Sequence, residues 1–221
     1  MSYYPVFLDL RGRRGLVVGG GAVASQKIAR LLRAGAHVTV VAPRAIEAIV
    51  RLAGEGRVTL RAHGYSPSDM VDIDLAVAAT DDPQVNRRVS ADARKARALV
   101  NVVDSPEQSS FIAPAILERG DLQVAVSTSG ASPSFATFVR DCLAEEIGPE
   151  YAAALSVLRR VRERLRAEAR PMEERKRILA ALAAGGLVER LRCGDHGGVD
   201  ELLRSLLGEA VTLERLGVGL E

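Results

Sequence analysis

The sequence predicts an α/β protein in which a doubly wound parallel sheet is followed by a small linking β layer and a helical C-terminal domain. Three observations lead to this prediction. Short β-branched runs alternate with Ala- and Leu-rich helical stretches over roughly the first hundred residues. Two further strand-like runs then follow each other directly. From Tyr151 onward the pattern is almost entirely helical.

The first part of the chain alternates strands with helices. This alternation implies a parallel sheet covered by helices on both faces, and the right-handed crossover rule makes a Rossmann-like topology the natural arrangement. Each strand is a short apolar run that ends at a turn signal, as Val41 does before Ala42-Pro43. The expected strands are 15–18, 37–41, 57–61, 74–78 and 99–103, and the expected helices are 22–34 and 84–97.

The alternating pattern changes after residue 105. Strands are expected at Phe111–Ile116 and Leu122–Ser127, with a polar turn at Glu118–Asp121 between them. A helix then starts with Ser132 as its N-cap and Pro133 at its first position.

Glycine pairs divide the helical tail. Gly148-Pro149 closes the preceding helix, and Gly185-Gly186 and Gly197-Gly198 are expected to break the tail into shorter helices. We therefore predict three domains: a nucleotide-binding domain at 1–113, a linking and dimerisation segment at 114–149, and a helical domain at 150–221.

Composition narrows the class of protein. With 48% hydrophobic and 26% charged residues among 221, the chain is expected to fold rather than remain disordered. A net charge of +2 gives no overall field that would attract nucleic acid or a membrane surface. No run of 18 apolar residues occurs, and charges from Asp9 to Arg14 interrupt any signal-peptide core. The expected location is therefore the cytoplasm, with neither nucleic acid nor membrane as a partner.

The segment after the first strand is typical of a nucleotide-phosphate site. Glycines occupy positions 19–21, and a helical pattern begins immediately at Ala22. The spacing fits a G-x-G-x-x-A fingerprint, with Gly19 for the tight turn, Gly21 for close approach to a pyrophosphate and Ala24 for helix packing. Unpaired N–H groups at the helix start would face the anion. The alternative is a purely structural turn.

The end of the second strand leaves the choice between NAD and NADP open. In such sites this strand usually ends in an acid that binds the ribose hydroxyls. Here the segment 40–44 reads Val-Val-Ala-Pro-Arg and contains no acid. Arg44 suits a 2′-phosphate or a position along the adenine. A solvated arginine that starts the next helix is the alternative.

Polar residues follow the fourth and fifth strands, at the sheet edge where ligands bind in such folds. Thr80 and Asp81 are candidates for cofactor contact, whereas Asp82 before Pro83 favours helix capping. Asp104 ends the fifth strand and could accept a proton or hold a cationic group. The alternative for both Asp81 and Asp104 is a purely structural role in a turn.

The hydroxyl-rich loop from Ser127 to Ser132 suits carboxylate binding, although an ordinary capped turn also explains Ser132.

Metal and hydrolase sites lack support in the sequence. The two cysteines, Cys142 and Cys193, and the three histidines have no metal-ligand spacing, so no metal site is expected. No G-x-S-x-G elbow supports a hydrolase triad.

These segments together resemble the precorrin-2 dehydrogenase / sirohydrochlorin ferrochelatase family, which also forms the N-terminal part of sirohaem synthases. The resemblance covers about the first 145 residues in the order and spacing of the family, while the tail matches only in its helical character. The matching segments are 4–10 (YPVFLDL), 17–24 (VVGGGAVA), Lys27, 35–43 (GAHVTVVAP), 78–82 (AATDD), 101–104 (NVVD), 111–115 (FIAPA), 127–133 (STSGASP) and Arg140.

The resemblance implies NAD-dependent oxidation of precorrin-2 to sirohydrochlorin by a homodimer. It assigns NAD binding to the backbone at Ala22-Val23 and Pro43-Arg44, and acid–base chemistry to Asp104. Thr128 falls where the family carries a Ser or Thr near the tetrapyrrole or metal path. The many carboxylates of the substrate imply arginines around the crevice. Some members of the family also insert Fe²⁺.

The residues predicted for the site fall into two groups. The catalytic candidates are Asp104 and Thr128. The cofactor-binding candidates are Gly19, Gly20, Gly21, Ala22, Val23, Pro43, Arg44, Thr80 and Asp81. Two alternatives to the dehydrogenase stay open: a non-enzymatic NAD-sensing module with a helical dimer arm, and a chelatase with vestigial NAD binding. A sensor has no need of Asp104 or of the hydroxyl-rich loop.

Overall fold

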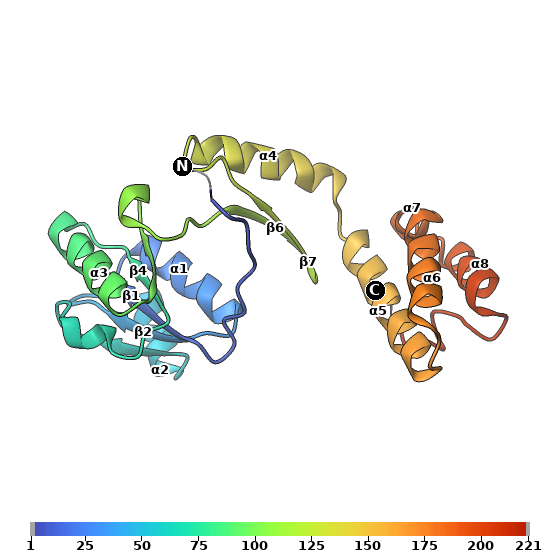
Figure 1. Ribbon diagram of the computed structural model, residues 1–221, viewed down its shortest axis with the longest axis horizontal. Coiled ribbons are helices and arrows are strands. Elements are labelled where there is room, and N and C mark those ends of the chain that lie inside the picture. Colours follow the sequence, from blue (N-terminus) through green and yellow to red (C-terminus); the bar gives the residue numbers. More distant parts are fainter. Residues whose placement is uncertain (1–2, 220–221) are drawn as a thin grey trace. The chain divides into compact units, whose positions relative to one another are not determined.

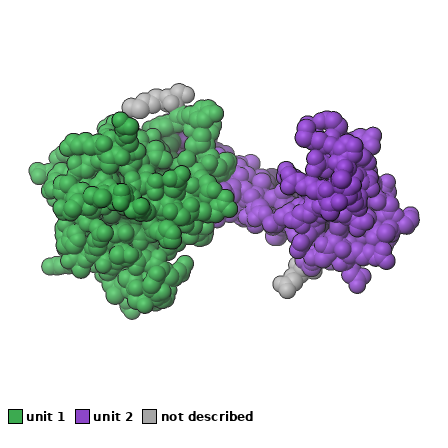
Figure 2. Space-filling model, turned by 60° about the horizontal axis from the view of Figure 1, so that its bottom comes forward, with its two compact units in different colours: residues 1–113 green, residues 114–221 purple. Residues whose placement is uncertain are grey.

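The structure is a computed structural model that describes residues 3–219. It divides into two compact units, Met1–Ala113 and Pro114–Glu221 (Figure 2). The predicted class is confirmed, because a five-stranded parallel sheet with helices is followed by a two-stranded antiparallel sheet and a helical region. The further boundary at residue 149 remains a prediction.

The first unit is built around a five-stranded sheet in the order β3-β2-β1-β4-β5, in which every pairing is parallel. β1 lies in the centre, so the chain crosses from one half of the sheet to the other between β3 and β4. Ligands bind at such a switch point, beyond the carboxyl ends of the strands. The strands are β1 (Arg14–Val18), β2 (His37–Val41), β3 (Val58–Arg61), β4 (Leu75–Ala78) and β5 (Leu99–Val102).

Alternation along the strands gives the sheet two separate hydrophobic faces. Leu16 and Val18 of β1 pack in one buried cluster with Val89 of α3 (Pro83–Lys95). Val17 points to the opposite face and packs with Ile28 of α1 (Ala22–Arg33) and Ile49 of α2 (Glu47–Gly54). The sheet is therefore covered on both sides, as Figure 1 shows.

The second unit begins with an antiparallel hairpin of β6 (Ala115–Arg119) and β7 (Leu122–Val126), against which α4 (Pro133–Glu146) packs. Ser132 is the N-cap of α4, and its hydroxyl accepts a hydrogen bond from Phe135 N at 3.2 Å. The predicted capping residue and the predicted first position of this helix are both confirmed.

The predicted limits of this hairpin are wrong at its first strand. The strand begins at Ala115 rather than Phe111, because the Phe111 side chain packs against the core of the first unit. Arg119, which was expected in the turn, belongs to β6 and its Nε donates to the carbonyl oxygen of Ile147 at 2.8 Å. The turn is confined to the residues between Arg119 and Leu122, where Gly120 has φ +57°.

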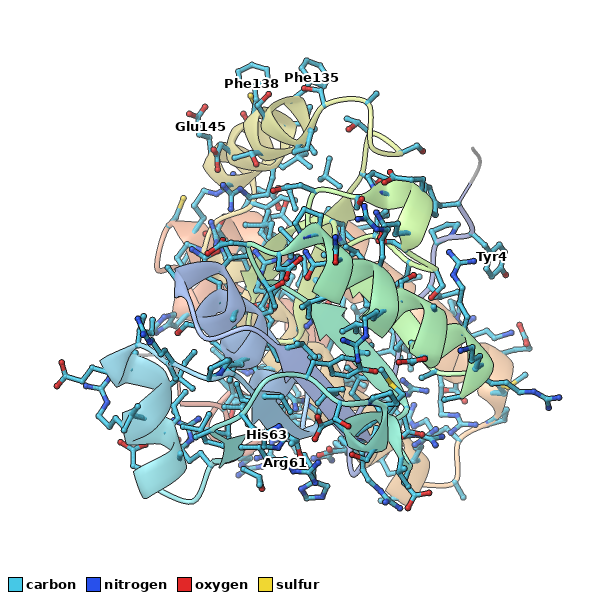
Figure 3. The ribbon with its side chains drawn as sticks, turned by 90° about the vertical axis from the view of Figure 1, so that its left-hand side faces the viewer. Tyr4, Arg61, His63, Phe135, Phe138 and Glu145 are labelled. Carbon is cyan, nitrogen blue, oxygen red and sulfur yellow. The ribbon has the colours of Figure 1, made fainter. Side chains whose placement is uncertain are left out.

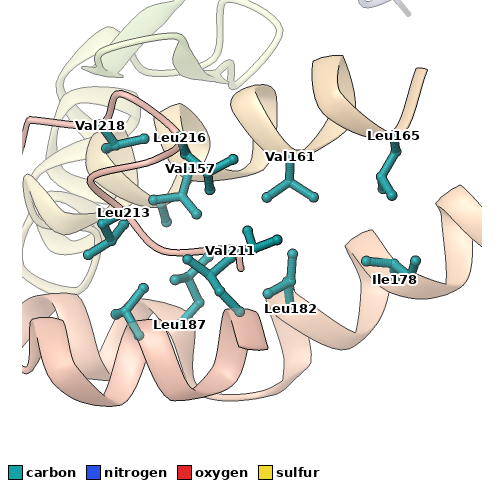
Figure 4. Packing of buried hydrophobic residues seen from close by; sticks show 13 residues of the cluster. Val157, Val161, Leu165, Ile178, Leu182, Leu187, Val211, Leu213, Leu216 and Val218 are labelled. Carbon is teal, nitrogen blue, oxygen red and sulfur yellow. The ribbon is translucent and has the colours of Figure 1, made fainter. Parts of the chain in front are cut away.

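Four helices and the segment that follows them, residues 208–219, form the rest of the second unit and enclose a buried hydrophobic cluster (Figure 4). Val161 and Leu165 of the first of these helices belong to this cluster together with Leu182 of the second and Leu187 of the third. The helices are α5 (Glu150–Ala167), α6 (Met172–Ala184), α7 (Leu187–Arg192) and α8 (His196–Leu207).

One predicted helix break in this region is wrong. Gly185-Gly186 does separate α6 from α7, but Gly197 and Gly198 lie inside α8. The Asp195 carboxylate accepts a hydrogen bond from Gly198 N at 2.8 Å and so caps α8 ahead of these glycines. The chain breaks instead at Gly194, which has φ +68°.

Candidate functional site

The turn between β1 and α1 requires glycine at two positions for packing reasons. Gly19 has φ +130°, and a Cβ there would lie 2.7 Å from the carbonyl carbon of Ala79. A Cβ on Gly20 would lie 2.9 Å from the Cα of Ala45. These two glycines let the loops after β4 and β2 close onto the turn.

Gly21 is different, because a Cβ there would meet no atom within 4 Å. It is the N-cap of α1 in an extended conformation, and as glycine it offers no side chain to the first-turn N–H groups. The open space and the unpaired donors fit a phosphate group at the helix N-terminus. The glycine turn therefore suits the pyrophosphate of a dinucleotide.

A cavity of about 820 Å³ lies over this turn, within the first unit. Its size falls in the range of about 300–1,000 Å³ typical of small-molecule sites. Residues that follow β1, β2, β4 and β5 line it, so it occupies the carboxyl edge of the sheet at the switch point. The structure brings Asp104 and all the predicted cofactor-binding residues to this one cavity: Gly19, Gly20, Gly21, Ala22, Val23, Pro43, Arg44, Thr80 and Asp81.

The turn after β4 is fixed by a side chain that sequence reasoning missed. The Thr80 hydroxyl donates to Asn86 Oδ1 at 2.8 Å, and Asn86 Nδ2 donates to the carbonyl oxygen of Thr80 at 3.0 Å. Asp82 caps α3 by accepting from Gln84 N at 2.7 Å, as the sequence predicts. Asn86 lies in the first turn of α3. The only feature of the sequence that indicates this role is a polar residue one helical turn after the expected N-cap, Asp82.

Asp104 lies exposed at the cavity edge, in a tight turn after β5. Its φ of +59° is left-handed, a region that Asp and Asn tolerate better than most residues. Val103 N donates to the carbonyl oxygen of Ala78 at 3.0 Å, which holds this turn against the end of β4. The backbone of this turn therefore places Asp104 in the lining of the same cavity as the glycine turn.

Lys27 interacts electrostatically with Asp104 and is half-buried on α1. Burial lowers the pKa of Lys27, and the neighbouring Arg30 lowers it further, while the Asp104 carboxylate opposes the shift. Lys27 lies one helical turn after Val23, which lines the cavity. The resemblance included Lys27, which the structure thus places within electrostatic range of Asp104.

Tyr65 forms part of the cavity wall and was also missed by sequence reasoning. Its side chain is buried and its hydroxyl donates to Asp92 Oδ2 at 3.1 Å. Burial and this hydrogen bond raise the pKa of Tyr65. No local pattern predicts this contact, because Asp92 is far along the chain on α3.

The loop that carries Tyr65 is anchored by a buried carboxylate. Asp69, in the 3₁₀ turn Pro67–Met70, accepts from Arg61 Nη1 at 2.8 Å and from Ser66 N at 2.9 Å. His63 Nε2 lies 3.7 Å from the same carboxylate. Figure 3 shows Arg61 and His63 next to each other at this edge of the unit. Arg61 is thus committed to holding the loop.

Thr128 lies in the second unit, in the loop between β7 and α4, and does not line the cavity. Its hydroxyl donates to the carbonyl oxygen of Ser132 at 2.9 Å and accepts from Ser132 N at 3.0 Å. Ser127 Oγ accepts from Ser129 N at 3.0 Å. Much of the hydroxyl content of this loop therefore stabilises the loop itself, and a catalytic role for Thr128 remains a prediction.

Residues 3–219 contain neither a metal-ligand cluster nor a membrane-spanning helix. No group of three or more His, Cys, Asp or Glu side chains there could hold a metal ion. None of the helices in the same range has the length and apolar character needed to cross a membrane.

Comparison with known proteins agrees with this geometry. Residues 6–115 match the family described as putative NAD(P)-binding, and residues 119–146 match the family described as sirohaem biosynthesis protein central. The first match spans the sheet and the whole cavity lining. The expected NAD-type cofactor is confirmed for the first unit.

Curated relatives carry the name siroheme synthase. The protein of Nitrosospira multiformis is 39% identical over 198 residues, which are 88% of this chain and 42% of the relative. That of Azotobacter vinelandii is 39% identical over 210 residues, covering 95% of this chain and 45% of the relative. The chain thus spans less than half the length of these relatives.

A solved structure extends the similarity to nearly the whole chain. The structure titled "SirC, precorrin-2 dehydrogenase" aligns with a TM-score of 0.79 and 28% sequence identity, over 92% of this chain and 98% of that one. It includes the helical tail, where the sequence resemblance was only general. The chain therefore belongs to the precorrin-2 dehydrogenase / sirohydrochlorin ferrochelatase family.

Proposed function

We propose that the chain is an NAD-dependent precorrin-2 dehydrogenase, which oxidises precorrin-2 to sirohydrochlorin on the route to sirohaem. The observation that carries the proposal is a single cavity in which an open glycine at the start of α1 and the carboxylate of Asp104 occur together. Sequence similarity to proteins named siroheme synthase and a fold shared with a structure titled as a precorrin-2 dehydrogenase support this substrate.

The residues of the cavity have separate tasks in this reaction. The N–H groups at the start of α1 and the glycine turn hold the pyrophosphate, and the loop after β2 carries the adenosine. NAD, when bound, accepts the hydride that the reduced tetrapyrrole loses. Asp104 accepts the proton that leaves the macrocycle in the same oxidation. The tight turn after β5 orients this carboxylate towards the cavity side of the sheet edge.

The assembly proposed with this function is a homodimer in the cytoplasm. Phe135 and Phe138 support it, since both are exposed on α4 and their ring centroids lie 6.0 Å apart. Figure 3 shows the two rings projecting together from the helix. A second copy of the chain that covers this apolar surface would remove both rings from water. Small-angle scattering at micromolar concentration tests the dimer, and a monodisperse monomer would refute it.

The activity is tested by anaerobic incubation of the purified protein with precorrin-2 and NAD. NADH absorbance and the tetrapyrrole spectrum are followed together, with and without Fe²⁺. We expect NADH to form in step with sirohydrochlorin. Binding of NAD without NADH formation would favour the NAD-sensing alternative. Iron insertion above the rate without enzyme, and without NADH, would favour the chelatase alternative.

A further inference from the structure

The first unit contains a second cavity, whose lining comes mainly from α1. Its volume is about 400 Å³, about half that of the first cavity and within the range typical of small-molecule sites. Five of its lining residues belong to α1, and the others are Leu52 of α2 and Arg57, which directly precedes β3. Among the described residues, the two cavities have no lining residue in common. The second cavity, which we call the α1–α2 cavity, is therefore a separate candidate site.

The base of the α1–α2 cavity is apolar and belongs to the core of the unit. Leu32 and Leu52 are half-buried, and both pack against the buried cluster that contains Ile28 of α1 and Ile49 of α2. Arg57 N donates to the carbonyl oxygen of Leu52 at 2.9 Å, which fixes the start of β3 against the end of α2. Packed elements therefore form the cavity, and its shape does not depend on the conformation of a long loop.

The charged side chains that line this cavity are all basic. They are Arg30, Arg33 and Arg57, and no Asp or Glu occurs among the described lining residues. Arg30 and Arg57 are exposed, and within residues 3–219 neither guanidinium makes a hydrogen bond or an ion pair. The sequence of α1 contains no acid. The α1–α2 cavity thus concentrates positive charge over an apolar base.

Neighbouring residues do not neutralise this charge. Burial lowers the pKa of Lys27 on α1, and the positive charge of Arg30 lowers it further. The carboxylate of Glu55, in the turn between α2 and β3, lies 3.9 Å from Arg51 Nε, and neither of these residues lines the cavity. A group of solvated surface arginines is the alternative. However, guanidiniums around a shared apolar surface without acids offer paired N–H donors to carboxylate or phosphate oxygens.

We propose that the α1–α2 cavity binds a small polyanion, which is a molecule with two or more carboxylate or phosphate groups. Arg30, Arg33 and Arg57 hold these groups through charge-assisted hydrogen bonds, and Leu32 and Leu52 contact the body of the ligand. The bound anion joins α1, α2 and β3, so it also stabilises the first unit. The inference does not rest on the proposed function, because the two cavities share no lining residue among those described.

The test is calorimetric titration of the full chain with pyrophosphate and, separately, with citrate, at about 0.1 M potassium chloride. NAD is present at saturation, so that neither anion occupies the glycine turn. We expect one anion to bind per chain with a Kd below about 1 mM, and the melting temperature to rise with anion concentration. Binding of pyrophosphate alone would identify phosphate as the recognised group, and binding of citrate alone would identify carboxylate.

A double variant, Arg30→Gln with Arg57→Gln, locates the site. Its anion affinity should fall by about tenfold or more, because each lost guanidinium removes charge-assisted hydrogen bonds. The matched control is Arg51→Gln with Arg87→Gln, which removes the same charge at exposed positions outside both cavities and should leave the affinity unchanged. Absence of anion binding in the presence of NAD would overturn the proposal. Equal losses of affinity in the two double variants would also overturn it, because they would indicate attraction by net charge alone.

Discussion

Gly19 packs so closely against the carbonyl group of Ala79 that a Cβ on residue 19 would lie 2.7 Å from the carbonyl carbon. Its φ of +130° is also a conformation that side chains rarely allow. We therefore predict that Gly19→Ala lowers the free energy of unfolding by about 2–5 kcal/mol. Differential scanning calorimetry of the purified variant measures the loss.

Gly54→Ala is the control for this substitution. Gly54 ends α2, and a Cβ there would meet no atom within 4 Å. Alanine should therefore be neutral or slightly stabilising at position 54. Equal melting temperatures for the two variants would show that the Gly19 contact with Ala79 does not determine stability.

Gly21→Asp should abolish NAD binding without unfolding the protein. The added carboxylate enters the open space at the start of α1 and repels the pyrophosphate, while its backbone φ of −90° suits aspartate. Calorimetric titration with NAD measures the affinity, and the melting temperature reports the fold. Gly21→Ala separates bulk from charge and should bind NAD more tightly than Gly21→Asp. If Gly21→Asp binds NAD as tightly as wild type, the glycine segment is only a structural turn and does not bind the pyrophosphate.

Asp104→Asn should retain NAD binding and lose most of the turnover of precorrin-2. Asparagine tolerates the left-handed φ of +59° and keeps the shape of the side chain, but it cannot accept the proton. The contribution of a positioned acid–base group predicts a fall in kcat of about 100-fold or more. Steady-state NADH formation gives the rate, and titration with NAD gives the affinity. Unchanged rates would remove Asp104 from the mechanism.

Asp74→Asn should destabilise the protein near neutral pH and have progressively less effect in acid. The hydrogen bond from Arg14 N, at 2.8 Å, and the guanidinium of Arg13 hold the pKa of Asp74 below its usual value. A lowered pKa in the folded state stabilises the fold above the unfolded pKa of about 4. That stabilisation is lost as the pH falls through the folded pKa.

Urea unfolding of wild type and variant at a series of pH values measures this convergence. Asp72→Asn is the control, because Asp72 pairs with the Arg14 side chain at the surface, where such pairs contribute little. A difference between wild type and Asp74→Asn that persists unchanged into strong acid would contradict the explanation.

Leu182→Ala should destabilise the second unit while NAD affinity is retained. The Leu182 side chain is fully buried in the cluster formed by α5 to α8, and truncation of such a leucine costs about 2–5 kcal/mol. Calorimetry should show a lowered melting transition, and titration with NAD should match wild type. Loss of NAD affinity in this variant would show that the second unit supports the nucleotide site.

The sheet was predictable because its strands are buried on both faces. Runs such as His37–Val41 are almost continuously β-branched, and the predicted limits of that strand agree with the structure. The hairpin in the second unit was less predictable. Phe111 has the composition of a strand residue, but its contacts with the first unit decide its conformation. Periodicity within one segment carries no information about such a contact.

The same distinction applies to the site. The glycine turn and Asp104 were predictable because they follow strands directly and all parallel strands end at one edge. Tyr65 was not predictable, because its place in the wall depends on a hydrogen bond to Asp92 of another element. The packing role of Gly20 depends equally on the loop after β2.

Within residues 3–219, most buried hydrophobic side chains fall into three clusters, and each cluster draws its members from one side of residue 113 only. A substitution that loosens the cluster of the second unit therefore removes no side chain from the two clusters that cover the sheet. Amino-acid substitutions can therefore become fixed at different rates in the two units. Selection can adjust nucleotide affinity through residues of the first unit while the helices of the second unit change independently. The first unit could also be exchanged between proteins as an independently packed domain.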